Sequence, residues 1–429
     1  MQLLNIFKIQ YLANSNSVKF SKVQAFFLLN NYQQFMNDLN YHGQVLATAK
    51  AKPAEIDELR EYSQNQFQFH FGKLEDIPLQ DEPHLSIWQS YCDAAESIGV
   101  EQVLKSRLAQ LNFAVEAGMS QTPAYKEAIR KGRWKPSPSA VQFEAKLELW
   151  IESTMAGRIP VIMTRSRADF VTLIQALTRK NEPLAVPDSM GACIVGGYNN
   201  WDRIRRYRRA WSDKPDGIAS QRASPNNTEA DWQLEFKRLI PQKSLYQDRF
   251  IILSRGSYSN VDAADLGLAP DVWQELSLKI RLEHECTHYL TRRLLGSMRN
   301  NLLDEAIADY QGIIAANGSY RADWFLHFLG MAGDEYCAGG RLENYRGSPP
   351  LSGGAFAVLQ TLVRQIAHNL ESFDRQYYQK RARSEREKLN VFLALTSSTI
   401  LDLAAADAVE MLTERAIEVG DHSTIHIAN

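Results

Sequence analysis

Apolar residues recur at spacings of three and four along much of the chain, which is the pattern of amphipathic helices. In the first part of the chain this pattern predicts four helices, at residues 23–39, 53–69, 85–113 and 139–155. From residue 270 onward nearly the whole chain has the same helical pattern. The protein is therefore expected to be mainly helical.

Two short runs rich in β-branched and other apolar residues interrupt this pattern, at 158–164 and 248–254. They predict strands, and the amphipathic stretch 167–178 predicts a helix directly after the first of them. Proline, glycine and polar clusters between residues 181 and 242 predict loops. The expected fold is α+β and mainly helical with a small sheet, divided into a helical N-terminal region (1–155) and a second region (156–429).

Composition narrows the class of protein. The 429 residues exceed the usual size of one hydrophobic core, and 45% hydrophobic with 23% charged residues is typical of globular proteins. A net charge of −2 provides no overall positive field, so nucleic acid is not expected as a partner. No stretch reaches the roughly 18 apolar residues of a membrane span, so no membrane association is expected.

The four cysteines are far apart and form no C-x-x-C pair, which favours reduced thiols over a disulfide scaffold or a cysteine-based metal site. The first 21 residues contain no continuous apolar core followed by a small-residue cleavage site, so secretion is not expected. These two observations together predict a cytoplasmic protein.

The segment that carries chemistry is His284-Glu285-Cys286-Thr287-His288, inside a helical pattern from about residue 271 to 295. On a helix, residues four apart are separated by about 40° around the axis and by one turn along it. Two imidazoles at His284 and His288 can therefore bind one ion. Cys286 falls on the opposite, apolar side of the helix and is interpreted as packing.

A hydrolytic zinc site uses three protein ligands and leaves one position for water, so a third ligand is required. Glu305 and Asp309 lie four residues apart in the next helical segment. Glu305 can bind the ion while Asp309 accepts the remaining N–H of a ligand histidine. Asp304 is an alternative third ligand, although only Glu305 has a partner four residues later.

Together, His284-Glu285-x-x-His288 and Glu305-x-x-x-Asp309 resemble the gluzincins, the thermolysin-like clan of zinc metallopeptidases. The resemblance implies that His284, His288 and Glu305 hold one Zn²⁺ per chain, that Glu285 is the general base, and that Asp309 orients a ligand histidine. It also implies that residues 156–429 form a zincin-like catalytic domain. The metzincin pattern does not fit, because residues 291 and 294 are threonine and leucine.

That clan commonly stabilises the oxyanion with a tyrosine or histidine from later in the chain. Tyr345 is the first choice for this role, followed by His327 and His368, and the alternative for Tyr345 is a packing tyrosine with a satisfied hydroxyl. The resemblance further implies that strand 248–254 is an edge strand that pairs with extended substrate. A buried strand without a ligand role is the alternative.

Two other segments each allow a functional and a purely structural interpretation. The glycine-containing run 190–197 either exposes its backbone near the cleft or only permits turns. Residues 201–211 contain five arginines among three aromatic residues, the composition of a nucleic-acid patch. Because the aromatic residues recur at helical spacing, a core-facing aromatic stripe with outward arginines is the favoured interpretation.

The sequence therefore predicts a zinc-dependent hydrolase, in the first place a metallopeptidase acting on a peptide or protein substrate. Hydrolysis of a non-peptide amide is an alternative, because metal ligands do not fix specificity. A helical binding protein with a structural zinc site is a second alternative.

Overall fold

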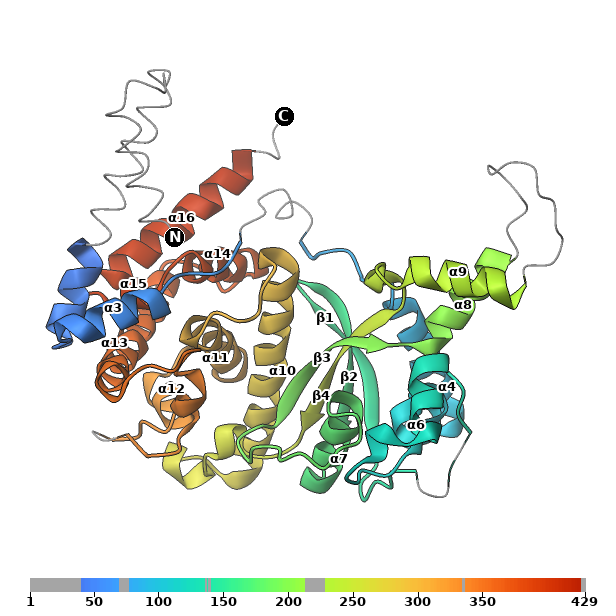
Figure 1. Ribbon diagram of the computed structural model, residues 1–429. Coiled ribbons are helices and arrows are strands. Elements are labelled where there is room, and N and C mark those ends of the chain that lie inside the picture. The colour runs from blue at the N-terminus through green and yellow to red at the C-terminus, as the bar shows by residue number, and fades with distance from the viewer. Residues whose placement is uncertain are drawn as a thin grey trace, which may run out of the picture.

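The computed structural model describes residues 40–68, 77–135, 137, 140–212, 228–333 and 336–425, with side chains up to residue 420. The helix expected at 23–39 lies outside these residues, as does most of the loop around 213–227. The described part is mainly helical with one small mixed sheet, which confirms the expected α+β class (Figure 1).

Residues 40–48 are helical. The later α-helices are α3 (Pro53–Tyr62), α4 (Leu85–Ile98), α5 (Val100–Arg107), α6 (Pro123–Lys131), α7 (Arg167–Thr178), α8 (Trp201–Ser212), α9 (Glu229–Leu239), α10 (Pro270–Leu295), α11 (Leu302–Asn317), α12 (Ala322–Phe328), α13 (Gly353–Tyr378), α14 (Glu385–Thr396), α15 (Ile400–Ala404) and α16 (Ala408–Ile425). Short 3₁₀ helices are η2 (Ala109–Asn112), η3 (Met119–Gln121), η4 (Lys243–Leu245), η5 (Tyr258–Asn260), η6 (Ala263–Leu266) and η7 (Arg341–Tyr345).

The sheet consists of β1 (Glu148–Thr154), β2 (Gly157–Thr164), β3 (Ala192–Asn199) and β4 (Gln247–Ser254) in the order β1-β2-β4-β3. The β1 and β2 strands form an antiparallel hairpin, β4 runs parallel to β2, and β3 is antiparallel to β4. The strands expected at 158–164 and 248–254 and the helix expected at 167–178 are therefore confirmed.

Several expectations about local structure were wrong. The helix expected over 53–69 ends at Tyr62, and residues 229–239, expected as loop, form α9. Residues 148–154 form β1 rather than the end of a helix, because every residue of this strand pairs with β2. The helix expected over 85–113 is broken by Gly99, whose φ of 86° lies outside the helical region. Residues 192–199, expected as loop, form β3, in which Gly197 has a φ of 96° at a β-bulge.

The β4 strand also differs from the expected edge strand. It is hydrogen-bonded to β2 on one side and to β3 on the other, so it is internal to the sheet and its last five residues are buried. The alternative of a buried strand is the one that the structure shows. The edge strand beside α10 is β3.

Both faces of the sheet are covered. Alternate β2 and β4 residues pack into two clusters, with Val161 and Ile251 in the cluster that contains α10 and Ile162 and Ile252 in the cluster that contains α4 and α7. This arrangement explains why these two strands are nearly continuous apolar runs. Figure 1 shows α10 on one side of the sheet and α7 with α4 on the other.

The N-terminal part of the chain packs with the C-terminal helices. Leu46, Leu59 and Tyr62 belong to the same buried cluster as α11, α13 and α14. A division at residue 155 falls in the turn between the paired strands β1 and β2. None of the described helices is both long and apolar enough to span a membrane, and the four cysteines are free.

Candidate metal centre

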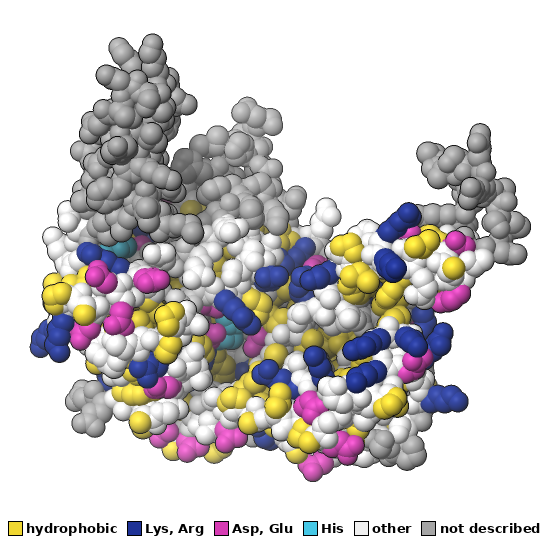
Figure 2. All heavy atoms as spheres, viewed as in Figure 1, with side chains coloured by type: hydrophobic (Ala, Val, Ile, Leu, Met, Phe, Trp, Pro, Cys, Tyr) yellow, Lys and Arg dark blue, Asp and Glu magenta, His cyan; other side chains and the backbone are white. Residues whose placement is uncertain are grey.

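The first two candidate ligands lie on α10. This helix begins with a proline in its first turn and ends at Gly296, whose φ of 74° is the left-handed conformation that favours glycine. His284 and His288 are 7% and 6% exposed, and Cys286 is buried in the apolar cluster on the other side of the helix. In Figure 2 a histidine side chain is visible in a hollow near the centre of the face shown, with acidic side chains beside it.

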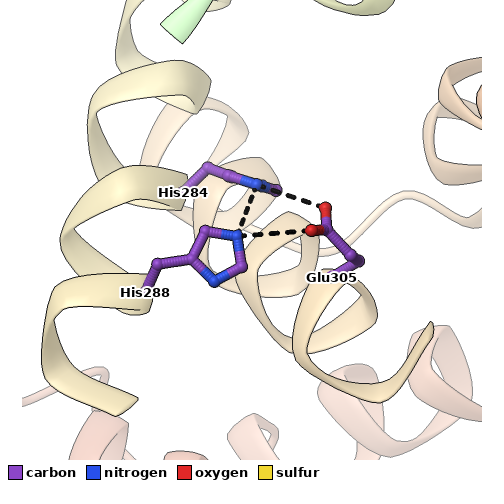
Figure 3. A group of neighbouring side chains, drawn as sticks. All are labelled: His284, His288 and Glu305. Atoms are coloured by element: carbon purple, nitrogen blue, oxygen red, sulfur yellow. Dashed lines mark hydrogen bonds and ion pairs between the residues drawn. The ribbon is translucent and has the colours of Figure 1, made fainter. Parts of the chain in front are cut away.

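The third candidate ligand is brought in by α11, which packs against α10. Figure 3 shows Glu305 pointing toward both histidines, with one carboxylate oxygen near each ring. The two Nε2 atoms are 3.0 Å apart, and the nearest Glu305 oxygens lie 3.5 Å from His284 and 3.6 Å from His288. Ligand atoms of a tetrahedral zinc site, each about 2.0–2.1 Å from the ion, are roughly 3.3 Å apart. His284, His288 and Glu305 could therefore hold a metal ion.

Asp309 lies where the sequence predicted it, one turn after Glu305. Its Oδ1 atom is 2.8 Å from Nδ1 of His284 and accepts a 2.6 Å hydrogen bond from the Tyr258 hydroxyl. An N–H on Nδ1 that points to Asp309 leaves the Nε2 lone pair free for an ion. Burial lowers the pKa of His284, but the carboxylates of Asp309 and Glu305 outweigh burial and raise the pKa to about 10.

His288 has a different neighbour. Its Nδ1 atom is buried, has no hydrogen-bond partner among the described residues, and lies 3.9 Å from Oδ2 of Asp304. The other Asp304 oxygen accepts a 2.7 Å hydrogen bond from the Asn300 amide. Asp304 therefore lies on the side of the His288 ring that faces away from Glu305. Of the two candidates for the third ligand, Asp304 and Glu305, only Glu305 belongs to the group that could hold an ion. Burial and the charge of His284 lower the pKa of His288 to about 4.

Glu285 lies between α10 and the edge strand β3. It is 8% exposed, and burial raises the pKa of its carboxyl to about 7. The His284 charge lowers this pKa, the Glu305 charge raises it, and a hydrogen bond from the Ile194 amide lowers it. A buried carboxylate with a pKa near neutrality is suited to accept and return a proton.

A buried arginine that the sequence did not indicate links the acidic residues of the site. The Arg341 side chain is 9% exposed and donates to Glu305 Oε2 at 2.8 Å and to Asp309 Oδ2 at 3.0 Å. It also donates to the hydroxyl of Tyr345 at 2.8 Å. Burial would raise the pKa values of Glu305 and Asp309, but the nearby cations keep both below their usual values.

Tyr345 contacts one of the three candidate ligands, Glu305. Its hydroxyl donates a 2.8 Å hydrogen bond to Glu305 Oε2, the same oxygen that Arg341 contacts. The two lower-ranked residues have other surroundings: His327 bonds through Nδ1 to the Asp323 carbonyl of its own helix, and His368 is exposed on α13.

Tyr258 is a second contact that the sequence did not indicate. Its hydroxyl lies 2.9 Å from His284 Nδ1 as well as 2.6 Å from Asp309. Its amide donates a 3.0 Å hydrogen bond to the Ser277 hydroxyl, and the chain before it is held by the 2.6 Å hydrogen bond from buried Arg281 to the Gly256 carbonyl. A tyrosine after the last strand is common, and no local spacing in the sequence relates it to His284.

The arginine-rich segment forms α8, as expected. Trp201, Tyr207 and Trp211 pack against a small cluster with α9, whereas Arg206 and Arg209 are exposed. The prediction of an aromatic stripe facing a core, with arginines outward, is confirmed for these residues. One arginine departs from it, because Arg203 is buried and pairs with Asp248 at 3.0 Å.

Comparison with known proteins assigns the chain to a family. One family model matches residues 44–407, which include all the residues of the metal centre. The chain belongs to DUF7005, a family of unknown function. No curated protein matches the chain, and no solved structure matches it.

Proposed function

We propose that this member of DUF7005 is a zinc-dependent hydrolase, and in the first place a metallopeptidase. The observation that carries the proposal is the position of Glu285. The charges of His284 and Glu305 and the Ile194 amide of the edge strand β3 all lie close enough to shift the pKa of the Glu285 carboxyl. One carboxylate thus lies between a site for an ion and a strand on which a peptide could be bound.

The number of ligands favours a catalytic over a structural ion. Structural zinc sites are closed by four protein ligands, whereas catalytic sites have three and leave one position open. Within the described residues the group comprises three, from two histidines and one glutamate. This donor set of nitrogen and oxygen atoms suits zinc.

The residues of the chain then have separate roles. His284, His288 and Glu305 would hold the ion, and Asp309 and Tyr258 would orient His284. When bound, zinc would supply Lewis acidity and lower the pKa of a coordinated water. Glu285 would accept a proton from the attacking water while the water oxygen bonds to the carbonyl carbon of the substrate. It would then deliver this proton to the leaving amine as the C–N bond breaks.

Tyr345 is the proposed donor to the developing oxyanion. Arg341 and Tyr345 both donate to Glu305 Oε2, so the carboxylate keeps a donor when the tyrosine hydroxyl turns to another oxygen. Because Glu305 has two donors, the Tyr345 hydroxyl can leave it and donate to the oxyanion, although it contacts Glu305 in this structure.

An extended peptide is the substrate that suits the edge strand. The β3 strand pairs with β4 on one side only, and its Ile194 amide is close enough to Glu285 to lower the pKa of that carboxyl. A peptide that pairs with this edge would place its backbone beside Glu285. The resemblance to gluzincins implies such a strand beside the metal helix, and we extend the zincin-like description to residues 156–429 on this basis.

The proposal is tested with purified full-length protein. We expect about one zinc per chain by elemental analysis, and cleavage of unfolded protein or a peptide library that stops with a chelator and returns with zinc. Glu305→Ala should lose zinc and cleavage together. Wild-type protein without zinc, or full zinc retention in Glu305→Ala, would rule out the ligand assignment. If only a non-peptide amide is hydrolysed, and this hydrolysis is sensitive to the chelator, the substrate class would change from peptides to non-peptide amides.

A further inference from the structure

The connection between the two ligand-bearing helices is fastened to a segment from the other end of the chain. This segment, residues 62–68, begins at the last residue of α3 and is here called the N-terminal strap. The Asn301 side chain donates a 2.7 Å hydrogen bond to the Tyr62 carbonyl, and the Gln68 amide donates a 3.1 Å bond to the Leu295 carbonyl. In Figure 1 the segment after α3 runs past α14 to the end of α10.

Asn300, which precedes Asn301, makes two more bonds to the strap. Its Oδ1 atom accepts a 3.2 Å bond from the Gln66 amide, and its Nδ2 atom donates a 2.9 Å bond to Asn65 Oδ1. Asn300 is 3% exposed, and its amide holds Asp304 beside His288. The strap is therefore connected to the metal centre through Asn300, whose side-chain oxygen, side-chain nitrogen and backbone amide each make a hydrogen bond.

The backbone conformation of Asn301 explains why these hydrogen bonds from the strap are needed. Asn301 has φ 53° and ψ −121°, a combination that favours glycine, and it immediately precedes α11. A strained residue persists only where its surroundings hold it. Glu305 lies in the first turn after this residue, so a change of the Asn301 backbone would move Glu305 relative to the two histidines.

The strap is itself anchored to the body of the protein. Asn65 Nδ2 donates to the Thr396 carbonyl at 2.7 Å and to the Ser398 carbonyl at 2.9 Å, both at the end of α14. The Tyr62 hydroxyl donates a 2.5 Å bond to the Tyr345 carbonyl. One short segment thus contacts α14, the α10–α11 connection and the residue proposed to stabilise the oxyanion.

We propose that the N-terminal strap is a positioning element of the metal centre, which sets the distance between Glu305 and the two histidines through Asn65, Asn300 and Asn301. The inference rests on the proposed function, because it requires that an ion binds there. A metal site tolerates only about 0.5 Å of displacement of its ligands, and the strap contacts the connection that governs this displacement. By linkage, zinc binding should in turn stabilise the strap.

The test measures zinc affinity of full-length variants by competition with a chromophoric chelator. Asn65→Ala removes the bonds to α14 and to Asn300, and we expect it to weaken zinc binding by about tenfold, the lower end of the usual loss for outer-shell partners. Asn369→Ala is the matched control, because Asn369 also donates to two carbonyls, those of Leu403 and Ala405, away from the metal centre. The control should lose thermal stability without losing zinc affinity.

A second variant covers the case in which Asn65→Ala does not fold. Asn301→Asp keeps a residue that tolerates a positive φ, so the backbone stays strained, but its carboxylate cannot donate to the Tyr62 carbonyl. The fold should be kept while zinc affinity falls several-fold. In both variants the absorption spectrum of bound Co²⁺ should change, and in wild type zinc should slow hydrogen exchange of the residue 66–68 amides.

The outcomes separate the two proposals. Zinc affinity and Co²⁺ spectra equal to wild type in Asn301→Asp, with unchanged exchange of the strap on zinc addition, would overturn the strap proposal alone. Absence of zinc from the wild type under the same conditions would overturn the proposed function and the strap with it.

Discussion

The Nδ1 atom of His284 lies 2.8 Å from Oδ1 of Asp309, and both residues are buried. The contact joins a residue of α10 to a residue of α11 one turn beyond Glu305. It fixes the ring so that Nε2 faces His288 and Glu305. The same carboxylate is paired with Arg341 at 3.0 Å, so its charge is balanced on both sides.

Replacing Asp309 with asparagine should weaken zinc binding by about 10- to 100-fold, because the amide supports the His284 tautomer less well than the carboxylate does. The measurement is competition for zinc with a chelator of known affinity. Asp374→Asn is a matched control, since Asp374 is also buried and pairs with a tyrosine hydroxyl and an arginine, Tyr310 and Arg383. Equal zinc affinities of Asp309→Asn and wild type would contradict the orienting role.

The sequence was sufficient to predict this part of the site because its geometry is local. Residues four apart on one helix must share a face, so His284 with His288, and Glu305 with Asp309, could be paired without a structure. The position of Asp304 on the other side of the His288 ring could not be predicted in this way. It depends on the orientation of α11 relative to α10, and residue spacing within one helix carries no information about that orientation.

Arg341 and Tyr258 could not be predicted in the same way. Arg341 is 36 residues from Glu305, and Tyr258 is 26 residues from His284. Each reaches the site through tertiary packing of a short 3₁₀ helix, which leaves no periodic signal in the sequence. Their roles became visible only as hydrogen bonds to the two carboxylates and to His284.

The sheet was predicted in part for a related reason. The β2 and β4 strands are buried on both faces and therefore appear as apolar runs, whereas β3 contains two adjacent glycines and a bulge. The edge position implied for β4 by the resemblance is wrong because β3, whose glycines carry no strand pattern, pairs with its second side. Residues 139–155 contain apolar residues that fit helical spacing, but Leu149 and Ile151 also alternate, and pairing with β2 decides in favour of a strand.

Replacing Tyr345 with phenylalanine should lower kcat by about 10²-fold and leave the zinc content unchanged, the effect of removing one oxyanion donor. Arg341 would continue to donate to Glu305 Oε2, so the ligand should stay in place. Steady-state kinetics and elemental analysis measure the two quantities. Tyr207→Phe is the control, because the Tyr207 hydroxyl also donates to a glutamate, Glu235, but lies on α8. Loss of zinc in Tyr345→Phe would show that the hydroxyl holds Glu305 in place for the ion and would contradict its role as oxyanion donor.

His84 should make the protein less stable in mild acid. It is 2% exposed, its Nε2 atom has no partner among the described residues, and burial lowers its pKa to about 4. The nearby Glu82 charge raises this pKa, and Arg203 and Arg249 lower it.

Because the folded pKa is below the unfolded value of 6.5, the neutral ring contributes stability above pH 6.5 that is lost as the pH falls toward 4. Between pH 7 and pH 5 the free energy of unfolding should fall by about 2 kcal/mol more in wild type than in His84→Gln. Denaturant unfolding at several pH values, with chelator present throughout, measures this difference. His368→Gln, at an exposed position, should follow the wild-type curve, and parallel curves for His84→Gln and wild type would refute the assignment.

The last prediction separates binding of the ion from chemistry on the substrate. Glu285 is proposed to handle a proton and not to touch the ion, so Glu285→Gln should keep the fold and about one zinc per chain. Cleavage should fall by about 10²- to 10⁴-fold, because loss of a general base has this effect, and more if Glu285 also positions the attacking water. Glu283→Gln is a closely matched control.

Glu283 is also a glutamate on α10 whose pKa is raised to about 7 by burial, but its charged neighbours are Lys388, Glu385 and Glu152 on other elements. Two residues along a helix correspond to about 200° around its axis, so Glu283 faces away from Glu285 and its variant should cleave as wild type does. His288→Ala should lose zinc and cleavage together, since two remaining ligands hold an ion poorly. If Glu285→Gln retains zinc and cleaves as fast as Glu283→Gln, the general-base mechanism is wrong. A structural ion in a helical binding protein would then become the better account of the site.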